Sequence, residues 1–73
     1  MTNEQVEKYN EIMDHIIARL SNFDGGVVIV NGTCSDAKVR EELLHDMAKE
    51  NWQLLFMKHY MEVRWIKPSR QPK

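Results

Sequence analysis

Residues 52–66 read WQLLFMKHYMEVRWI and contain neither glycine nor proline. Aromatic and β-branched residues are frequent in this stretch, which is typical of β-strands. One strand of this length would span roughly 50 Å at about 3.3 Å per residue, which is too long for a small domain. We therefore predict a hairpin that reverses near Lys58, His59 and Tyr60, although none of the three is a favoured turn residue. A bent strand, or an arm that pairs with a second copy of the chain, is the alternative.

A second strand signal precedes this stretch. The β-branched run from Val27 to Val30 lies between Gly26 and the pair Asn31-Gly32. Because the run is short and apolar at every position, it predicts a central strand that is buried on both faces. The residues after it favour a loop and a helix, because they do not alternate and they contain helix-capping side chains.

Two helices complete the pattern. Apolar residues recur at intervals of three and four along residues 3–21, which predicts an amphipathic helix. Thr2, followed three residues later by Gln5, predicts a capping box at the start of this helix. A second amphipathic helix is expected over about residues 36–50.

The order helix, strand, helix, strand, strand predicts an α+β fold. We expect a two-layer sandwich with two helices on one face of a three-stranded mixed sheet. If the first two strands are neighbours, a right-handed crossover makes them parallel, and the last pair is antiparallel. Residues 1–67 are expected to form a single small α+β domain, and residues 68–73 a disordered basic tail.

Size and composition bound the class of protein. The chain has 73 residues, of which 42% are hydrophobic and 29% are charged. This balance is ordinary for a folded domain, and a domain this small buries only about 60% of the surface of its unfolded chain. Cys34 is the single cysteine, and no signal-peptide pattern or long apolar run is visible. We therefore expect a soluble cytoplasmic protein with no membrane partner.

The charge is divided unevenly along the chain. Residues 1–57 carry ten acidic and five basic side chains, whereas residues 58–73 carry five basic side chains and one acidic one. The formal net charge of -1 conceals this division. Such asymmetry predicts that the basic end meets an acidic partner while the acidic end repels it.

Cys34 is the one residue at which the sequence suggests covalent chemistry. It lies between the valine-rich strand and the second helix, and Arg40 follows six positions later. A thiolate at this place could attack phosphorus while a guanidinium binds the other phosphate oxygens. The loop lacks the glycines that wrap a phosphate, however, and Asp36 places a negative charge where the anion would lie. We favour the alternative in which Cys34 packs beside a helix cap formed by Thr33, Ser35 and Asp36.

The sequence predicts no metal or cofactor site. His15, His45 and His59 lack ligand spacing, and one cysteine is too few for a structural zinc site. A metal held by His45, Cys34 and His59 across the fold is the alternative that the sequence leaves open.

The last strand supplies the candidate partner-binding residues. Strand alternation divides it into two faces, one with Met61, Val63 and Trp65 and the other with Glu62, Arg64 and Ile66. The first face is expected in the core, where Trp65 cannot stack on a base. We predict that a partner contacts the second face and its surroundings. The candidate residues are Lys58, Tyr60, Glu62, Arg64, Ile66 and Lys67.

Three function classes follow from these patterns. The leading hypothesis is a small non-enzymatic interaction or regulatory module, of adaptor or inhibitor type, that binds an acidic protein partner and self-associates as a homodimer. Stand-alone domains of this size are typical of such proteins, including those of phages and mobile elements. The alternative is a nucleic-acid-binding protein that uses Lys58, Tyr60, Arg64, Lys67 and Arg70. The third hypothesis is a thiol-dependent enzyme centred on Cys34.

Overall fold

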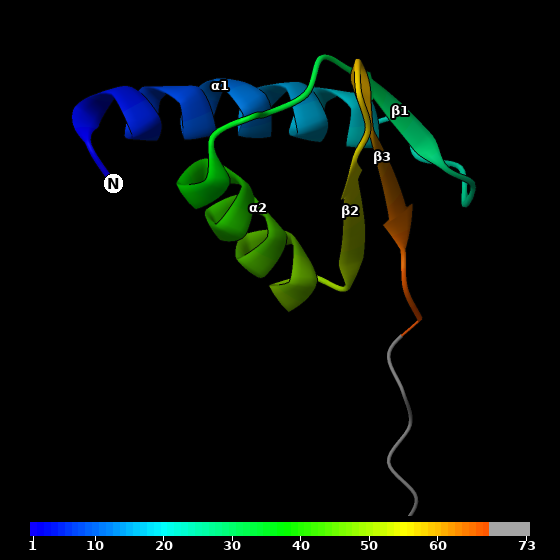
Figure 1. Ribbon diagram of the computed structural model, residues 1–73. Helices are drawn as coiled ribbons and strands as arrows, with labels where there is room; N and C mark the ends of the chain where they lie inside the picture. The colour runs from blue at the N-terminus through cyan, green and yellow to red at the C-terminus, as the bar shows by residue number, and fades with distance from the viewer. Residues whose placement is uncertain (68–73) are drawn as a thin grey trace, which may run out of the picture.

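The computed structural model describes residues 1–67, and the predicted tail 68–73 lies outside the described residues. The elements, in the expected order, are α1 (Asn3–Leu20), β1 (Val28–Asn31), α2 (Ala37–Lys49), β2 (Trp52–Phe56) and β3 (Tyr60–Trp65). Both helices lie on the same side of the three-stranded sheet (Figure 1), which confirms the α+β prediction. In this part of the chain, neither helix has the length and apolar content that crossing a membrane requires.

The last strand of the chain lies in the middle of the sheet. The strand order is β1-β3-β2, and β3 pairs with both neighbours in antiparallel fashion. β1 and β2 therefore run in the same direction without being paired. The predicted mixed sheet is wrong. It would have required β1 and β2 to be parallel neighbours joined by a crossover through α2, but β3 lies between them.

β1 is consequently an edge strand. This corrects the prediction that the run from Val27 to Val30 is buried on both faces. Val30 is buried, whereas Val27 and Ile29 are exposed. β-branched residues favour a strand on either face of a sheet, but only one face of this strand is buried.

β2 and β3 form the predicted hairpin. The Met57 amide donates a hydrogen bond to the Tyr60 carbonyl at 2.8 Å, which leaves Lys58 and His59 as a two-residue loop. The Gly32 amide donates to the His59 carbonyl at 3.0 Å. The loop is therefore supported by a contact from a distant part of the chain, which compensates for the absence of favoured turn residues.

The hydrophobic core fills the layer between the helices and the sheet. Its buried members are Ile12, Ile16, Val30, Cys34, Val39, Leu43, Met47, Leu54, Met61 and Val63. Trp52 packs at the margin, with its ring edge-on to Phe23 at 5.0 Å between centroids. Trp65 is the register partner of Trp52 and is 46% exposed, so its predicted place in the core is wrong. The core ends at Trp52 on this side of the sheet, and Trp65 is left at its edge.

Gly32 offers a test of the connection between β1 and the hairpin. Its φ of +90° lies in a region that side chains strain to adopt, although a Cβ would meet no atom within 4 Å. We expect Gly32→Ala to lower the free energy of unfolding by about 1–2 kcal/mol, measured by urea denaturation. Gly26→Ala is the matched control, because Gly26 has no positive φ and its Cβ would lie at an ordinary 3.5 Å from Asp24. Equal losses in the two variants would contradict the backbone explanation.

Candidate interaction surface

Strand register determines which side chains lie on the side of the sheet away from the helices. Met61 and Val63 of β3 are buried in the core. Their neighbours along the strand therefore face the opposite way, together with their register partners on β1 and β2. We call this surface the outer face; it consists of Val27, Ile29, Asn31, Gln53, Leu55, Met57, Tyr60, Glu62, Arg64 and Ile66. No element of residues 1–67 covers it (Figure 1).

The outer face is rich in exposed apolar side chains. The exposed members are Val27 (47%), Ile66 (47%), Ile29 (40%), Leu55 (38%) and Met57 (36%). They make up half of the ten large apolar residues that are exposed in the described chain. A contiguous apolar region on the surface of a small protein marks an interaction site more often than scattered apolar residues do.

Two opposite charges occupy the middle of this apolar surface. The Arg64 Nη2 atom lies 3.8 Å from the Glu62 Oε1 atom, on the same strand and the same face. Arg64 is therefore paired within β3, not with the acidic helices. Because both groups keep contact with water, this pair contributes little to the stability of the fold.

The structure brings four of the six predicted site residues together. Tyr60, Glu62, Arg64 and Ile66 line the outer face along β3 and its continuation, as the alternation predicted. Lys58, in the hairpin loop, and Lys67, after Ile66, are exposed at the two ends of this line. Sequence reasoning missed Val27, Ile29 and Leu55, although the alternation of β2 about its buried Leu54 was a signal for Leu55.

Cys34 and Arg40 lie close together in a different arrangement from the one that phosphate chemistry requires. Cys34 is 1% exposed, and its Sγ atom lies 3.7 Å from the Asp36 carbonyl oxygen. The Arg40 Nε atom donates a hydrogen bond to the Cys34 carbonyl oxygen, and the guanidinium lies 4.9 Å from the centroid of the Phe56 ring. Arg40 therefore links the loop before α2 to β2.

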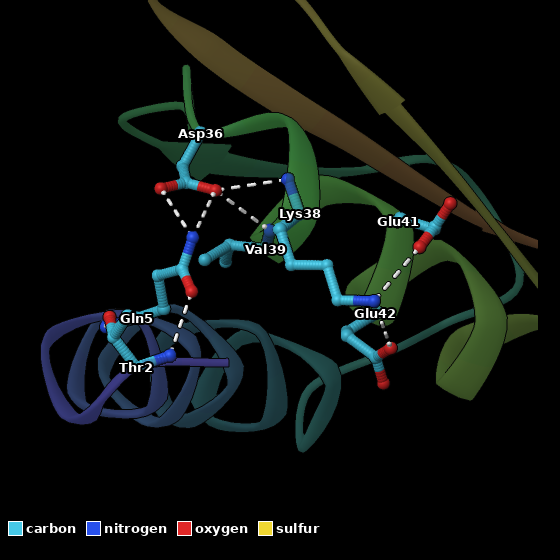
Figure 2. A network of polar contacts seen from close by, with 7 residues as sticks. All are labelled: Thr2, Gln5, Asp36, Lys38, Val39, Glu41 and Glu42. Carbon is cyan, nitrogen blue, oxygen red and sulfur yellow. Dashed lines mark hydrogen bonds and ion pairs between the residues drawn. The ribbon is translucent and has the colours of Figure 1, made fainter.

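Asp36 anchors the start of α2 and joins it to α1 (Figure 2). Its Oδ1 atom accepts hydrogen bonds from the Lys38 amide at 2.9 Å and the Val39 amide at 3.1 Å. The Gln5 Nε2 atom donates to both carboxylate oxygens, at 3.3 and 3.2 Å. The Val39 amide, followed by Gln5, lowers the pKa of Asp36. The amides that would bind an anion at this helix end are thus taken by a carboxylate of the chain itself.

Helix capping follows the sequence in part. Thr2 and Gln5 form the predicted capping box, with hydrogen bonds of 2.8 and 3.2 Å. Asp36 caps α2 as expected. The capping role of Thr33 is wrong, because its buried Oγ1 atom has no hydrogen-bond partner within the described residues.

Tyr9 ties the middle of α1 to α2. Its hydroxyl donates a hydrogen bond to the Asp46 Oδ2 atom. Burial, and then this hydrogen bond, raise the pKa of Tyr9 to about 12. The contact is structural, because it holds the two helices together on the side of the sheet away from the outer face.

No metal centre is visible in residues 1–67. Nowhere among them do three or more His, Cys, Asp or Glu side chains gather closely enough to hold an ion. His45, Cys34 and His59, which the sequence left open as a ligand set, are not brought together.

The Tyr9–Asp46 contact predicts a loss of stability in alkali. Tyr9 titrates at about 12 in the folded state, against 10.0 for an ordinary tyrosine. A raised folded pKa contributes stability that is complete below pH 10 and is lost as the pH rises towards 12. In urea denaturation we expect wild type to lose its advantage over Tyr9→Phe across this range. A constant difference between wild type and Tyr9→Phe would contradict the prediction.

The burial of Cys34 predicts a slow thiol. Cys34 is the only cysteine in the chain. The absorbance of the thiolate that an aromatic disulfide reagent releases therefore measures the reaction of this residue alone. We expect the folded protein to react on the order of 100-fold or more slowly than the urea-unfolded chain, since the thiol is reached only when the core opens. Similar rates in the two states would show that the thiol is accessible, and would favour the enzyme hypothesis.

Comparison with known proteins identifies no relative. The chain matches no family model, none of the curated proteins and none of the solved structures.

Proposed function

We propose that this protein is a small non-enzymatic interaction module, of adaptor or inhibitor type, that docks another protein surface onto the outer face. The exposed apolar surface of the sheet is the observation that carries this proposal. An antiparallel sheet with one face in the core usually presents polar side chains on the other. Here the solvated face instead presents five large apolar residues around a central ion pair.

The polar side chains of the region suit a protein partner. Tyrosine, methionine and arginine are enriched at protein interfaces, and the outer face offers Tyr60, Met57 and Arg64. Lys58 and Lys67 add positive charge at the two ends of the β3 line. Charges at the margin of an interface set orientation and association rate, so these lysines favour a partner with acidic residues around an apolar centre.

The face of the sheet is a better docking surface than its β1 edge. Along an antiparallel pair of strands, hydrogen-bonded residue pairs alternate with non-hydrogen-bonded ones. The hydrogen bond from the Gly32 amide to the His59 carbonyl sets this alternation for β1 and β3, so the N–H and C=O groups of Ile29 point away from β3. The Arg19 Nε atom donates to the Ile29 carbonyl oxygen at 3.1 Å. This contact occupies an acceptor that an added strand would need.

Nucleic-acid binding is a second candidate, favoured by the exposure of Trp65. An exposed tryptophan beside basic residues can stack on a base. Strand alternation, however, places Trp65 on the opposite side of β3 from Tyr60 and Arg64, and Glu62 is paired with Arg64. The Trp65 ring and the Arg64 cation thus lie on opposite sides of the sheet, and we rank this function second.

Because the sole cysteine is unpaired and buried, we propose a reducing cytoplasm as the compartment.

A matched pair of leucines tests the proposed docking surface. Leu55 on the outer face and Leu44 on α2 are 38% and 42% exposed. We expect tagged wild type and Leu44→Ser to capture the same protein from a native lysate, with or without nuclease. Leu55→Ser should capture at least about tenfold less of this protein, because an apolar contact at the centre of an interface contributes about 1–3 kcal/mol to binding.

Two results would contradict the docking proposal. Equal capture by Leu55→Ser and wild type would remove the outer face as the binding surface. Loss of capture on nuclease treatment would favour the nucleic-acid function, and purified protein should then bind an oligonucleotide with an affinity that falls steeply with salt and with Arg64→Ala.

A further inference from the structure

We infer that the outer face is occupied by a second copy of this chain, related to the first by a two-fold axis that lies between the two sheets. The inference rests on the proposed function, because it names the occupant of the same docking surface. It follows from the register of the three strands, which makes the outer face complementary to itself.

The register sets out the outer face in rows. Val28, Val63 and Leu54 lie side by side across the sheet; Val63 and Leu54 are buried, and Val28 is partly buried against the core. The outer-face row on one side of them contains Ile29, Glu62 and Leu55. The row on the other side contains Arg64 and Gln53, with Val27 in line just before β1. Farther out, Tyr60 begins β3 and Ile66 follows its last residue, three positions on either side of Val63.

A two-fold axis across the strands above Val63 exchanges these rows. It places Glu62 of one copy over Arg64 of the other, and Arg64 over Glu62. It likewise places Ile29 over Val27 on β1, and Tyr60 over Ile66 on β3. Leu55 then lies over the aliphatic part of Gln53. Packed sheets lie about 10 Å apart, a distance that glutamate and arginine side chains span together.

The two charges distinguish this axis from the alternative one. An axis along β3 would place Glu62 over Glu62 and Arg64 over Arg64, and like charges that face each other oppose association. The axis across β3 gives two reciprocal ion pairs instead. The pair within each copy, at 3.8 Å, already places both groups near each other on this face, so that dimerisation exchanges one partner for another. The ion pairs set the alignment, and the apolar rows around them supply the affinity.

The size of the surface predicts a moderate affinity. Three strands at about 4.8 Å and six residues at about 3.3 Å give a face of roughly 15 by 20 Å, which is small for a stable interface. We therefore expect a dissociation constant on the order of micromolar. A small domain gains stability from such an association, so the melting temperature should rise with protein concentration.

A head-to-tail assembly is the competing arrangement. Glu4, Glu7, Glu11 and Asp14 recur at helical spacing along α1, and this acidic stripe would face the cations of a neighbour. Such a contact joins two different surfaces, so each copy keeps one free surface and the assembly grows beyond a dimer. The two-fold arrangement stops at two copies and leaves α1 free.

Charge reversal tests the two-fold arrangement. Sedimentation velocity from about 1 to 100 µM should show wild type shifting from monomer to dimer. Glu62→Arg and Arg64→Glu should each weaken self-association by about tenfold or more, because each brings like charges together across the axis. An equimolar mixture of the two variants should form a dimer, since arginines of one copy then face glutamates of the other. The double variant Glu62→Arg/Arg64→Glu should dimerise by itself.

Glu7→Arg is the matched control, because it makes the same charge change on α1. It should leave the dimer intact, whereas a head-to-tail assembly would be weakened by it. If one single variant fails to fold, as judged by circular dichroism, the double variant still tests the exchange of charges. A wild-type monomer at 100 µM, dimerisation of both single variants with the affinity of wild type, or a mixture that stays monomeric would overturn the inference.

The outcomes separate this inference from the docking proposal. A monomeric wild type whose Leu55→Ser variant loses its captured protein would overturn the homodimer and leave the outer face as a surface for another protein. A monomeric wild type whose capture is unaffected by Leu55→Ser would overturn both. A wild-type dimer that responds to the charge reversals, together with loss of the captured protein in Leu55→Ser, supports both.

Discussion

The pairing of β3 with both of its neighbours is the constraint on which the rest of the structure depends. β1 and β2 are separated by twenty residues of loop and helix, and they are joined in the sheet only through β3. One side of β3 buries Met61 and Val63 beneath α1 and α2, so the alternation of a strand directs Glu62 and Arg64 outward. The core and the outer face are therefore two consequences of one strand in one register, and a slip by one residue would exchange them.

Polar contacts between the helices fix the other side of the core. Gln5 completes the cap of its own helix and also donates to Asp36, so the starts of α1 and α2 are held by one shared network. Tyr9 makes a second connection through Asp46. Within residues 1–67, these contacts orient two helices that share a core of ten buried residues. In the loop around Cys34, the Lys38 and Val39 amides and the Arg40 Nε atom likewise have hydrogen-bond partners within the chain.

Local patterns predicted the elements, and pairing between distant segments escaped them. The helical spacing, the Thr2–Gln5 capping box and the extended character of residues 52–66 were all read correctly, because each depends on neighbours within a few positions. Strand order depends instead on which strand β1 meets, and Val27 to Val30 carries the same β-branched signal at an edge as in a centre. That ambiguity hid Ile29 and Val27 as members of the outer face, while the alternation of β3 located Tyr60, Glu62 and Arg64 without any knowledge of strand order. Trp65 was misplaced because alternation gives the direction of a side chain but not where the helices end above it.

The exposed apolar residues of the outer face contribute little to the stability of the fold that presents them. Ile29, Leu55 and Ile66 keep between a third and a half of their surface in water, so little of the hydrophobic stabilisation of the monomer comes from them. Apolar side chains at these positions instead expose a sheet to unwanted association, which proteins commonly limit with lysines and other charges. Lys58 and Lys67 supply such charges at the two ends of β3 and Arg64 supplies one in the middle of the outer face, yet the apolar side chains between them remain exposed. The outer face combines apolar rows with charges along its central strand, which restricts association to partners that match both features. In the proposed two-fold arrangement above Val63, a second copy matches both features, because it carries the same residues.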